Sequence, residues 1–447
     1  MRRIRAAVAT GTLLAACSAP LATAPSAQAA DAPGFHIQDG RLLDANNKDF
    51  VMRGVNHAHT WYPDKTDQAL KDIKAKGANT VRVVLGTGDQ WSKNDTADVT
   101  RVVSQCKANR LICVLEAHDT TGYGEAGAAV PLSKAVDYWL SVRDALVGQE
   151  KYVLVNIGNE PHGNTNYTAW TNDTKSAIGR LRSAGLEHTL MVDAPNWGQD
   201  WSFTMRDNAA AVLAADPDRN TLFDVHMYGV YDTPAEVSDY LNRFTAAKLP
   251  IVVGEFGDMH SDGNPDEDAI MATAQSKGIG YLGWSWSGNG SGVEYLDLVQ
   301  NFDASRLTDW GKRLFDGANG IKSTAKEASV FGGSDGGTDP GEGACAVTYR
   351  LSDWGSSFNA DVTIRNTSDK RIDGWKLGFA FPGQQKINSV WNAKAVQSGA
   401  GVHITPEPWT NSIPAGGTVS FGLNGSSTGA NTAPTSFTLD SRTCTVI

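Results

Sequence analysis

Two glutamates lie at the ends of apolar runs, and their side chains are of the type that catalyses the cleavage of a glycosidic bond. Glu160 lies in Asn159-Glu160-Pro161 after the run 153–157, and Glu255 lies in Gly254-Glu255-Phe256-Gly257. Hydrolysis of a glycosidic bond needs one carboxylic acid to protonate the leaving oxygen and one carboxylate at the anomeric carbon. The two glutamates are therefore the candidate catalytic pair. The structural alternative for Glu160 is a residue that only caps the next helix.

Other polar side chains stand beside the ends of such runs. We expect Arg82 and Tyr228 to hold Glu255 ionised by charge and hydrogen bonding, which would lower the pKa of its carboxyl. Asn159 can hydrogen-bond the 2-hydroxyl of a sugar, an interaction that strengthens in the transition state. Arg82 as a plain ion-pair partner in the barrel lining remains the alternative.

Aromatic and histidine side chains complete the candidate site. Trp284 offers a flat face to a sugar ring, and Trp286 is its rival because alternate residues of a strand share a face. His118 and His226 also stand near strand ends, where structural histidines are the alternative. Trp197 and Trp201 are equally compatible with a sugar platform and with packing.

These side chains need elements that bring them to one place. Short apolar runs recur in residues 31–330 at 50–55, 80–85, 111–116, 153–157, 189–192, 222–226, 251–255 and 281–286. Helical stretches lie between them, which indicates a parallel sheet covered by helices. About eight such units in ~300 residues predict an α/β fold, the (β/α)8 TIM barrel, whose active site lies at the C-terminal ends of its strands. A doubly wound sheet is the alternative, but no Gly-x-Gly-x-x-Gly follows the first strand.

The composition changes after this region. Residues 331–344 are rich in glycine and predict a flexible linker. Residues 345–447 alternate apolar and polar positions between turns, which predicts a small all-β sandwich. We thus expect a catalytic domain at 31–330, a linker at 331–344 and a β-sandwich module at 345–447.

The first thirty residues predict export. Arg2, Arg3 and Arg5 precede a short apolar run, and Ala27-Gln28-Ala29-Ala30 resembles a signal-peptidase site. We therefore expect 1–30 to be a signal peptide and the protein to be secreted. The alternative is a lipoprotein cleavage box at Leu14-Ala15-Ala16-Cys17.

Cysteine content agrees with export. Of the 5 cysteines, Cys17 would leave with the signal peptide. The even number that remains favours two disulfides, Cys106 with Cys113 and Cys345 with Cys444, although the spacing alone allows three pairings.

Charge excludes some partners and permits others. The formal net charge of -10 makes nucleic acid and anionic membranes poor partners, whereas a neutral polysaccharide is not repelled. The acidic loop 258–268 lacks the distal glutamate of an EF-hand, so we expect a solvated loop, with structural calcium as the alternative. The proposed chemistry requires no metal and no cofactor.

The motifs resemble glycoside hydrolase family five, and within it the bacterial endo-β-1,4-mannanases. The longer matching stretches are Arg53-Gly54-Val55-Asn56-His57-Ala58-His59, His118-Asp119-Thr120-Thr121-Gly122, Asp193-Ala194-Pro195-Asn196-Trp197-Gly198 and Gly283-Trp284-Ser285-Trp286-Ser287-Gly288-Asn289. The resemblance implies Glu160 as acid/base and Glu255 as nucleophile of a retaining endo-β-1,4-mannanase. It also implies a sugar-binding shell made of Arg82, His118, Asn159, His226, Tyr228 and Trp284.

The C-terminal region resembles family-two carbohydrate-binding modules. The matching stretches are Trp354-Gly355-Ser356-Ser357-Phe358, Asp373-Gly374-Trp375, Pro408-Trp409-Thr410-Asn411-Ser412-Ile413-Pro414-Ala415-Gly416 and Phe421-Gly422-Leu423-Asn424-Gly425. The resemblance implies that Trp354, Trp391 and Trp409 lie on one flat face and stack on cellulose, whereas Trp375 belongs to the core.

Together these observations predict a secreted, monomeric enzyme that cuts β-mannan and is held on cellulose by its module. An endo-β-1,4-glucanase with the same carboxylates is the first alternative. A polysaccharide-binding protein without activity is the second, and the presence of both glutamates speaks against it.

Overall fold

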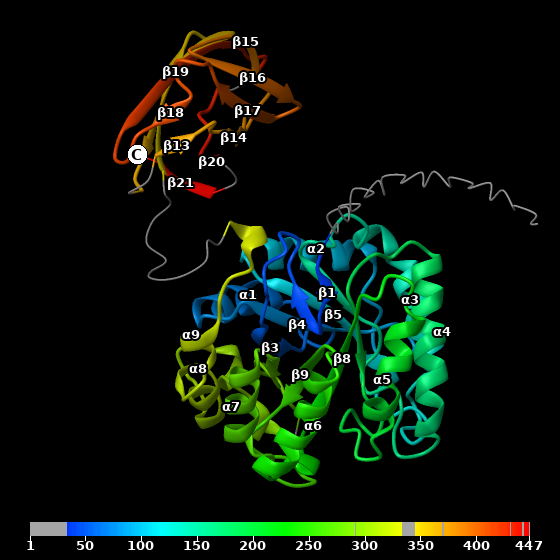
Figure 1. Cartoon of the computed structure of the whole chain (residues 1–447). Coiled ribbons are helices and arrows are strands. Elements are labelled where there is room, and N and C mark those ends of the chain that lie inside the picture. The colour runs from blue at the N-terminus through cyan, green and yellow to red at the C-terminus, as the bar shows by residue number, and fades with distance from the viewer. Residues whose placement is uncertain are drawn as a thin grey trace, which may run out of the picture. The chain divides into compact units, whose positions relative to one another are not determined.

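The computed structural model describes residues 34–290, 292–332, 345–368, 371–429, 431–439 and 442–446. The expected signal peptide and most of the expected linker lie outside the described residues. The N-terminal part of the described chain contains a closed barrel of parallel strands, and the C-terminal part is built of strands that pair mostly antiparallel (Figure 1).

The eight barrel strands confirm the predicted (β/α)8 fold. They are β3 (Arg53–His57), β4 (Thr80–Leu85), β5 (Ile112–Ala117), β6 (Val153–Asn156), β7 (Leu190–Asp193), β8 (Thr221–Met227), β9 (Ile251–Phe256) and β10 (Gly280–Gly283). Strand β10 pairs with β3 and closes the barrel. All the residues of these strands are buried, which explains why each strand reads as a short run without polar alternation.

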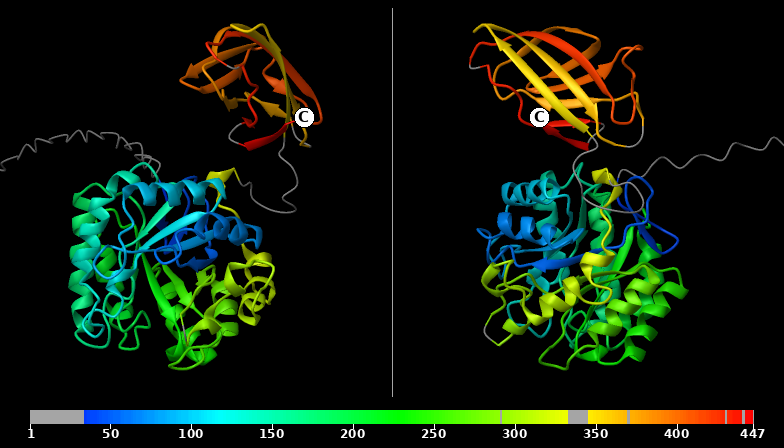
Figure 2. Two further views of the ribbon diagram at one scale, coloured as in Figure 1. Left: turned by 180° about the vertical axis from the view of Figure 1, so that it is seen from behind. Right: turned by 90° about the vertical axis from the view of Figure 1, so that its left-hand side faces the viewer.

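Helices surround the barrel, as the two further views show (Figure 2). They are α1 (Thr66–Ala75), α2 (Thr96–Ala108), α3 (Leu132–Ser141), α4 (Trp170–Ser183), α5 (Thr204–Ala215), α6 (Pro234–Ala246), α7 (Glu267–Lys277), α8 (Asp309–Asp316) and the short α9 (Ile321–Thr324). In α2, Val99, Val102, Val103 and Cys106 form the buried stripe that faces the barrel. Asp95 caps this helix by accepting the backbone N–H of Asp98.

The hairpin β1 (His36–Gln38) and β2 (Arg41–Leu43) precedes the first barrel strand. Its residue Leu42 joins Phe35, Phe50 and Met52 in an apolar cluster with Ile112 and other barrel residues. This cluster includes residues from the N-terminal ends of strands, so the opposite ends are left to carry polar side chains.

The C-terminal strands confirm the all-β prediction. They are β11 (Cys345–Asp353), β12 (Ser357–Asn366), β13 (Ile372–Asp373), β14 (Leu377–Ala380), β15 (Lys386–Trp391), β16 (Ala393–Ser398), β17 (Gly401–Pro406), β18 (Ser412–Ile413), β19 (Thr418–Ser426), β20 (Phe437–Leu439) and β21 (Arg442–Val446). Trp375 is fully buried among the core residues and stacks on Phe421, as expected for a core tryptophan. The predicted disulfide between Cys345 of β11 and Cys444 of β21 is confirmed.

The predicted disulfide between Cys106 and Cys113 is wrong in this structure. Both thiols are free, and their sulfur atoms lie 3.0 Å apart, whereas a disulfide bond is about 2.05 Å long. Cys106 belongs to α2 and Cys113 to β5, so the packing of the helix on the strand sets this separation. Burial raises the pKa of the Cys113 thiol well above its ordinary value, which disfavours the thiolate needed for oxidation.

Candidate active site

The candidate site lies at the C-terminal ends of the barrel strands. A pocket there is lined by all but two of the predicted site residues of the barrel, together with aromatic side chains of the loops. Its lining includes Trp61, Tyr62, Trp91, His118, Asn159, Glu160, Tyr228, Glu255 and Trp284. The other two, Arg82 and His226, are fully buried and contact the glutamates from below. The structure therefore brings all eight predicted barrel residues together.

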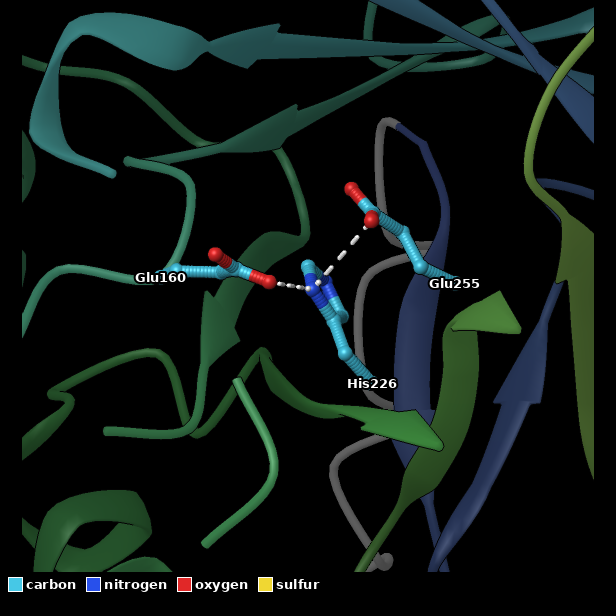
Figure 3. A group of neighbouring side chains, drawn as sticks. All are labelled: Glu160, His226 and Glu255. Atoms are coloured by element: carbon cyan, nitrogen blue, oxygen red, sulfur yellow. Dashed lines mark hydrogen bonds and ion pairs between the residues drawn. The ribbon is translucent and has the colours of Figure 1, made fainter. Parts of the chain in front are cut away.

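His226 lies between the two glutamates (Figure 3). Its Nδ1 is 2.8 Å from Oε1 of Glu160 and 3.5 Å from Oε2 of Glu255. One carboxylate oxygen of each glutamate lies within 4.8 Å of the other. Carboxyl groups about 5–5.5 Å apart are typical of retaining glycosidases, and inverting enzymes place them about 6.5–9.5 Å apart. The arrangement therefore suits direct attack by one carboxylate on the anomeric carbon.

Arg82 lies beneath the two glutamates and hydrogen-bonds to several side chains of the site. Each of its five N–H groups has an acceptor, at 2.7–3.2 Å: Oδ1 of Asn156, Asn56 and Asn159, Oε1 of Glu255 and Oδ2 of Asp193. A planar fork with all its donors satisfied fixes the positions of the groups that it binds. Glu255 receives a second hydrogen bond from the Tyr228 hydroxyl, at 3.1 Å.

The expected lowering of the Glu255 pKa is wrong. Burial raises the pKa of this carboxyl above its ordinary value, while the positive charges of His226 and Arg82 oppose the rise and the charge of Glu160 adds to it. The loss of hydration thus outweighs the favourable contacts that the sequence suggested.

For His226, the charges of the neighbouring side chains outweigh the effect of burial on the pKa. Burial alone would lower the pKa of its imidazole, but the carboxylates around it, Glu255 first, raise that pKa well above the ordinary value. Below the ring, its Nε2 lies 3.4 Å from Oδ2 of Asp193 and 3.5 Å from Oδ2 of Asp224. The positive imidazolium therefore separates two layers of acidic groups.

The backbone at Glu160 is strained. Its φ of +40° lies in the left-handed region that favours glycine, and such strain persists where the surroundings hold it. The Glu160 N–H donates to Oδ2 of Asp193 at 3.1 Å, and the Asp193 carboxylate also contacts Arg82. Asp193 thus positions both glutamates, one through its backbone and the other through Arg82.

His118 and Trp284 form one wall of the pocket. Their rings stack at 5.8 Å between centroids, with 17° between the planes. Glu116 holds the His118 ring, with Oε1 3.1 Å from Nδ1. Burial alone would lower the pKa of His118, but Glu116 raises it above its ordinary value. Trp286, the rival of Trp284, is fully buried and packs edge-on against Phe315, so it has no face to offer a sugar.

Several residues that the structure places in the site had no role predicted from the sequence. They are Asn56, Trp61, Tyr62, Trp91, Glu116, Asn156, Asp193 and Asp224. For Glu116, Asn156, Asp193 and Asp224 the signal was available, since each is a buried polar residue within or at the end of an otherwise apolar run. The loop aromatics gave no such signal, because exposed and buried aromatic residues look alike in a sequence.

Among the described residues, ligand atoms of His, Asp and Glu come close enough to share a metal ion in two groups, both in the site. One is Glu160 with His226 and Glu255, and the other is Asp193 with Asp224 and His226. In the acidic loop, Asp262 instead accepts hydrogen bonds from Gln199 and from the backbone of Gly229.

The three tryptophans expected to bind cellulose are exposed on the C-terminal domain. Their exposed fractions are 62% for Trp354, 43% for Trp391 and 72% for Trp409. The Trp409 indole N–H points to Oδ1 of Asn392, the residue after Trp391, at 3.4 Å. Core tryptophans would be covered, as Trp375 is, so these side chains are available to a ligand.

Known proteins share this architecture. Residues 345–444 match the cellulose binding domain family. The chain is 61% identical over 355 residues to a mannan endo-1,4-beta-mannosidase of Streptomyces lividans, over 77% of this chain and 92% of the relative. It is 48% identical to the enzyme of the same name from Cellvibrio japonicus, over 84% of this chain and 83% of the relative.

A solved structure, the mannohexaose complex of Thermomonospora fusca beta-mannanase, is 58% identical with a TM-score of 0.65, and the match covers 66% of this chain and 99% of that one. Residues 43–290 match the cellulase family, glycosyl hydrolase family 5. With its catalytic-type barrel, its paired glutamates and these relatives, the chain belongs to glycosyl hydrolase family 5.

Proposed function

We propose that this protein is a secreted, retaining endo-β-1,4-mannanase that acts by double displacement. The observation that carries the mechanism is the close approach of the Glu160 and Glu255 carboxylates, within 4.8 Å, on either side of His226. The mannan substrate is supported by the identity of 61% to a mannan endo-1,4-beta-mannosidase that the chain spans almost completely.

Glu255 is the nucleophile in this proposal. Arg82 and Tyr228 hold its two oxygens, so the carboxylate is fixed with one face toward the pocket. It attacks the anomeric carbon, and the bond to the leaving oxygen breaks as a covalent glycosyl-enzyme forms. Water then releases the sugar with retained configuration. Both steps use side chains of the chain alone and need no cofactor.

Glu160 is the acid and then the base. It gives its proton to the leaving oxygen, and it later takes a proton from the attacking water. Its contact with the imidazolium of His226 fixes the Oε1 atom and leaves the other oxygen free toward the pocket. Trp284, stacked on His118, supplies the flat wall for the sugar at the cleavage point.

The first test is the release of reducing sugar by the purified protein from β-mannan and, in parallel, from carboxymethyl-cellulose. We expect release from mannan, and we expect Glu255→Ala to abolish it and Glu160→Ala to lower kcat by about 10²–10⁴-fold. A preference for the cellulose derivative would keep the mechanism and replace the substrate. Inactivity on both would contradict the proposed function.

We also propose the division into a signal peptide at 1–30, a catalytic domain at 31–330, a linker at 331–344 and a module at 345–447 that binds cellulose through Trp354, Trp391 and Trp409. Deleting 332–447 should spare hydrolysis of soluble mannan and weaken action on plant cell-wall solids, because tethering raises the local enzyme concentration. Equal loss on both substrates would contradict this division of labour.

The proposed secretion and monomeric state have direct readouts. Mass spectrometry of protein from the culture medium should give the mass of a chain that begins after residue 30. Size-exclusion chromatography with light scattering should give the mass of one chain. A lipidated N-terminal cysteine would instead support the lipoprotein alternative.

A further inference from the structure

A cavity lies at the opposite end of the barrel from the two glutamates. It has a volume of about 240 Å³, and it is walled by the hairpin of β1 and β2, by the C-terminal ends of α6 and α7, and by the first residues of β9. Ile251 at the start of β9 lines this cavity, whereas Glu255 lies four residues further along the same strand, about 13 Å away. The proposed catalytic steps therefore do not use this cavity.

The buried part of the cavity lining is apolar. Phe50, Met52, Leu222 and Val252 line it, and all four belong to the apolar cluster at the N-terminal ends of the strands. Apolar surface that borders an open space favours a ligand that removes it from water. An apolar cavity of about 150 Å³ already holds a benzene molecule, so this volume admits one aromatic ring and a polar group.

The wall that the hairpin forms is fixed in place. Gly40 in the turn has a φ of +77°, and a Cβ added there would lie 2.6 Å from the carbonyl carbon of Lys248. The turn therefore lies directly against the connection between α6 and β9. Leu42 of the same hairpin is buried and also lines the cavity. Because the wall is already in place, a ligand would order few groups when it binds.

Cationic side chains surround the mouth of the cavity. Arg41, Lys248 and Lys277 belong to its lining, together with one acidic residue, Asp39. Arg41 already forms an ion pair with Asp49, but the Lys248 ammonium lies 3.7 Å from the Asp39 carboxylate, beyond hydrogen-bond distance. Positive side chains thus outnumber negative ones in this lining, although the formal net charge of the chain is -10.

The two lysines also stand at helix ends. Lys277 lies in the last turn of α7, and Lys248 follows the end of α6. The dipole of a helix places about half of a negative charge at this end, whereas each lysine carries a full positive charge, so positive charge remains for a ligand. Lys248 has a φ of +53°, at a position after a helix where glycine is the ordinary residue. The rim therefore carries this charge on an unfavourable backbone.

We infer that this cavity binds a small organic carboxylate whose apolar body is about the size of one aromatic ring. The body would contact Phe50 and Met52, whose ring and sulfur atom both favour aromatic partners. The carboxylate would face the ammonium groups of Lys248 and Lys277. This inference goes beyond the proposed function and does not depend on it. Because the ligand would bind the folded chain, it should raise the unfolding temperature and leave hydrolysis unchanged.

Benzoate and benzyl alcohol, which share a ring and differ in charge, test this inference. In the full chain with isotope-labelled methionine methyl groups, the NMR signal of Met52 reports on the cavity. Met259, on the loop that carries His260 of the catalytic pocket, reports on binding there. We expect benzoate to shift the Met52 signal with a Kd on the order of 1 mM and to leave the Met259 signal in place. Benzyl alcohol should bind about tenfold more weakly, because it lacks the charge that the lysines attract.

The charge is tested by the double substitution Lys248→Gln and Lys277→Gln. It should weaken benzoate to the level of benzyl alcohol and leave the affinity for benzyl alcohol unchanged. Lys151→Gln is the matched control, since Lys151 is exposed on the connection before β6 and lies outside the cavity lining. This variant should bind benzoate as the native protein does, and Met52→Leu assigns the reporting signal.

Two results would overturn the inference. A Met52 signal that benzoate does not move would show that the cavity takes no such ligand. Equal affinity for benzoate and benzyl alcohol would show that the lysines serve the helix ends and do not recognise a carboxylate. Neither readout uses activity, so a protein that fails to cut mannan would contradict the proposed function and leave this test intact.

Discussion

At the scale of single residues, the site brings buried cationic and acidic side chains into direct contact. Arg82 and the imidazolium of His226 face Glu160, Glu255, Asp193 and Asp224, and most of these groups are fully buried. Burial raises the pKa of Asp224 to about 7, whereas Arg82 and His226 lower that of Asp193 to about 2 against the effect of burial. The pKa values of these two neighbouring aspartates differ because Asp193 contacts Arg82 directly, whereas burial and the charge of Asp193 dominate at Asp224.

The raised pKa of Glu255 predicts how activity depends on pH. The nucleophile works as the carboxylate, so kcat/KM should fall as the pH decreases through this pKa, which burial places above the ordinary value of about 4.3. Tyr228→Phe removes a hydrogen bond to the charged form and should move the acidic limb of the profile to higher pH by roughly one unit. The measurement is kcat/KM for soluble mannan from about pH 3 to about pH 8, a range that includes the ordinary pKa of a glutamate.

Tyr138→Phe is the control for this change. The Tyr138 hydroxyl is also buried, but it donates to the Asn94 carbonyl and contacts none of the catalytic groups. Its profile should coincide with that of the native protein. An acidic limb that stays in place in Tyr228→Phe would show that Tyr228 does not stabilise the Glu255 carboxylate.

At the scale of elements, the sequence predicted the barrel because its strands are covered on both faces. A run such as Thr80–Leu85 is buried throughout, so apolar residues dominate it and an arginine within it stands out. The same logic located Asn159, Glu160 and Glu255, since polar residues at strand ends meet at one edge of a barrel. Distances between side chains are not encoded this way, and the Cys106–Cys113 pairing failed for that reason.

Other features of the site depend on contacts that no local pattern reveals. The balance that raises the Glu255 pKa depends on how completely the folded chain removes water from the carboxyl. The role of Asp193 depends on the left-handed backbone of Glu160, which turns its N–H toward β7. Both properties arise from the packing of strands that are distant in the sequence.

The loop from β7 to α5 yields a prediction at this scale. Gly198 has a φ of +71°, and a Cβ added there would lie 2.6 Å from the His226 ring. Gly198→Ala should therefore displace His226 from the glutamates and lower kcat by about tenfold or more, because misplaced groups lose their orientation toward the substrate. Kinetics on soluble mannan and a circular dichroism spectrum would measure activity and folding separately.

Gly179→Ala is the matched glycine control. Gly179 lies within α4, and a Cβ added there would meet nothing within 4 Å. Alanine in a helix should leave kcat unchanged and stabilise the fold by up to about 1 kcal/mol. An active Gly198→Ala protein would show that the loop does not fix the position of His226.

At the scale of the whole molecule, the two domains have hydrophobic cores of different size. In the catalytic domain a large apolar cluster, with members from Val55 to Ile321, is formed by residues of the barrel strands and of the helices around them. The C-terminal domain has a much smaller core, around Trp375, Leu377 and Phe421. A small core gives little stability to spare, so a covalent cross-link matters more there. Within the described residues, no helix combines the length and apolar character needed to cross a membrane.

The Cys345–Cys444 disulfide closes a loop across a separation of 99 residues. Replacing both cysteines with serine should lower the free energy of unfolding of the C-terminal domain by about 4–5 kcal/mol, since the cross-link restricts the unfolded chain. Differential scanning calorimetry should show one transition moved to lower temperature, with the barrel transition in place. Hydrolysis of soluble mannan at moderate temperature should not change, whereas retention on cellulose should be lost first on heating. If both transitions moved together, the two domains would depend on each other for stability, and the division of labour proposed above would have to be abandoned.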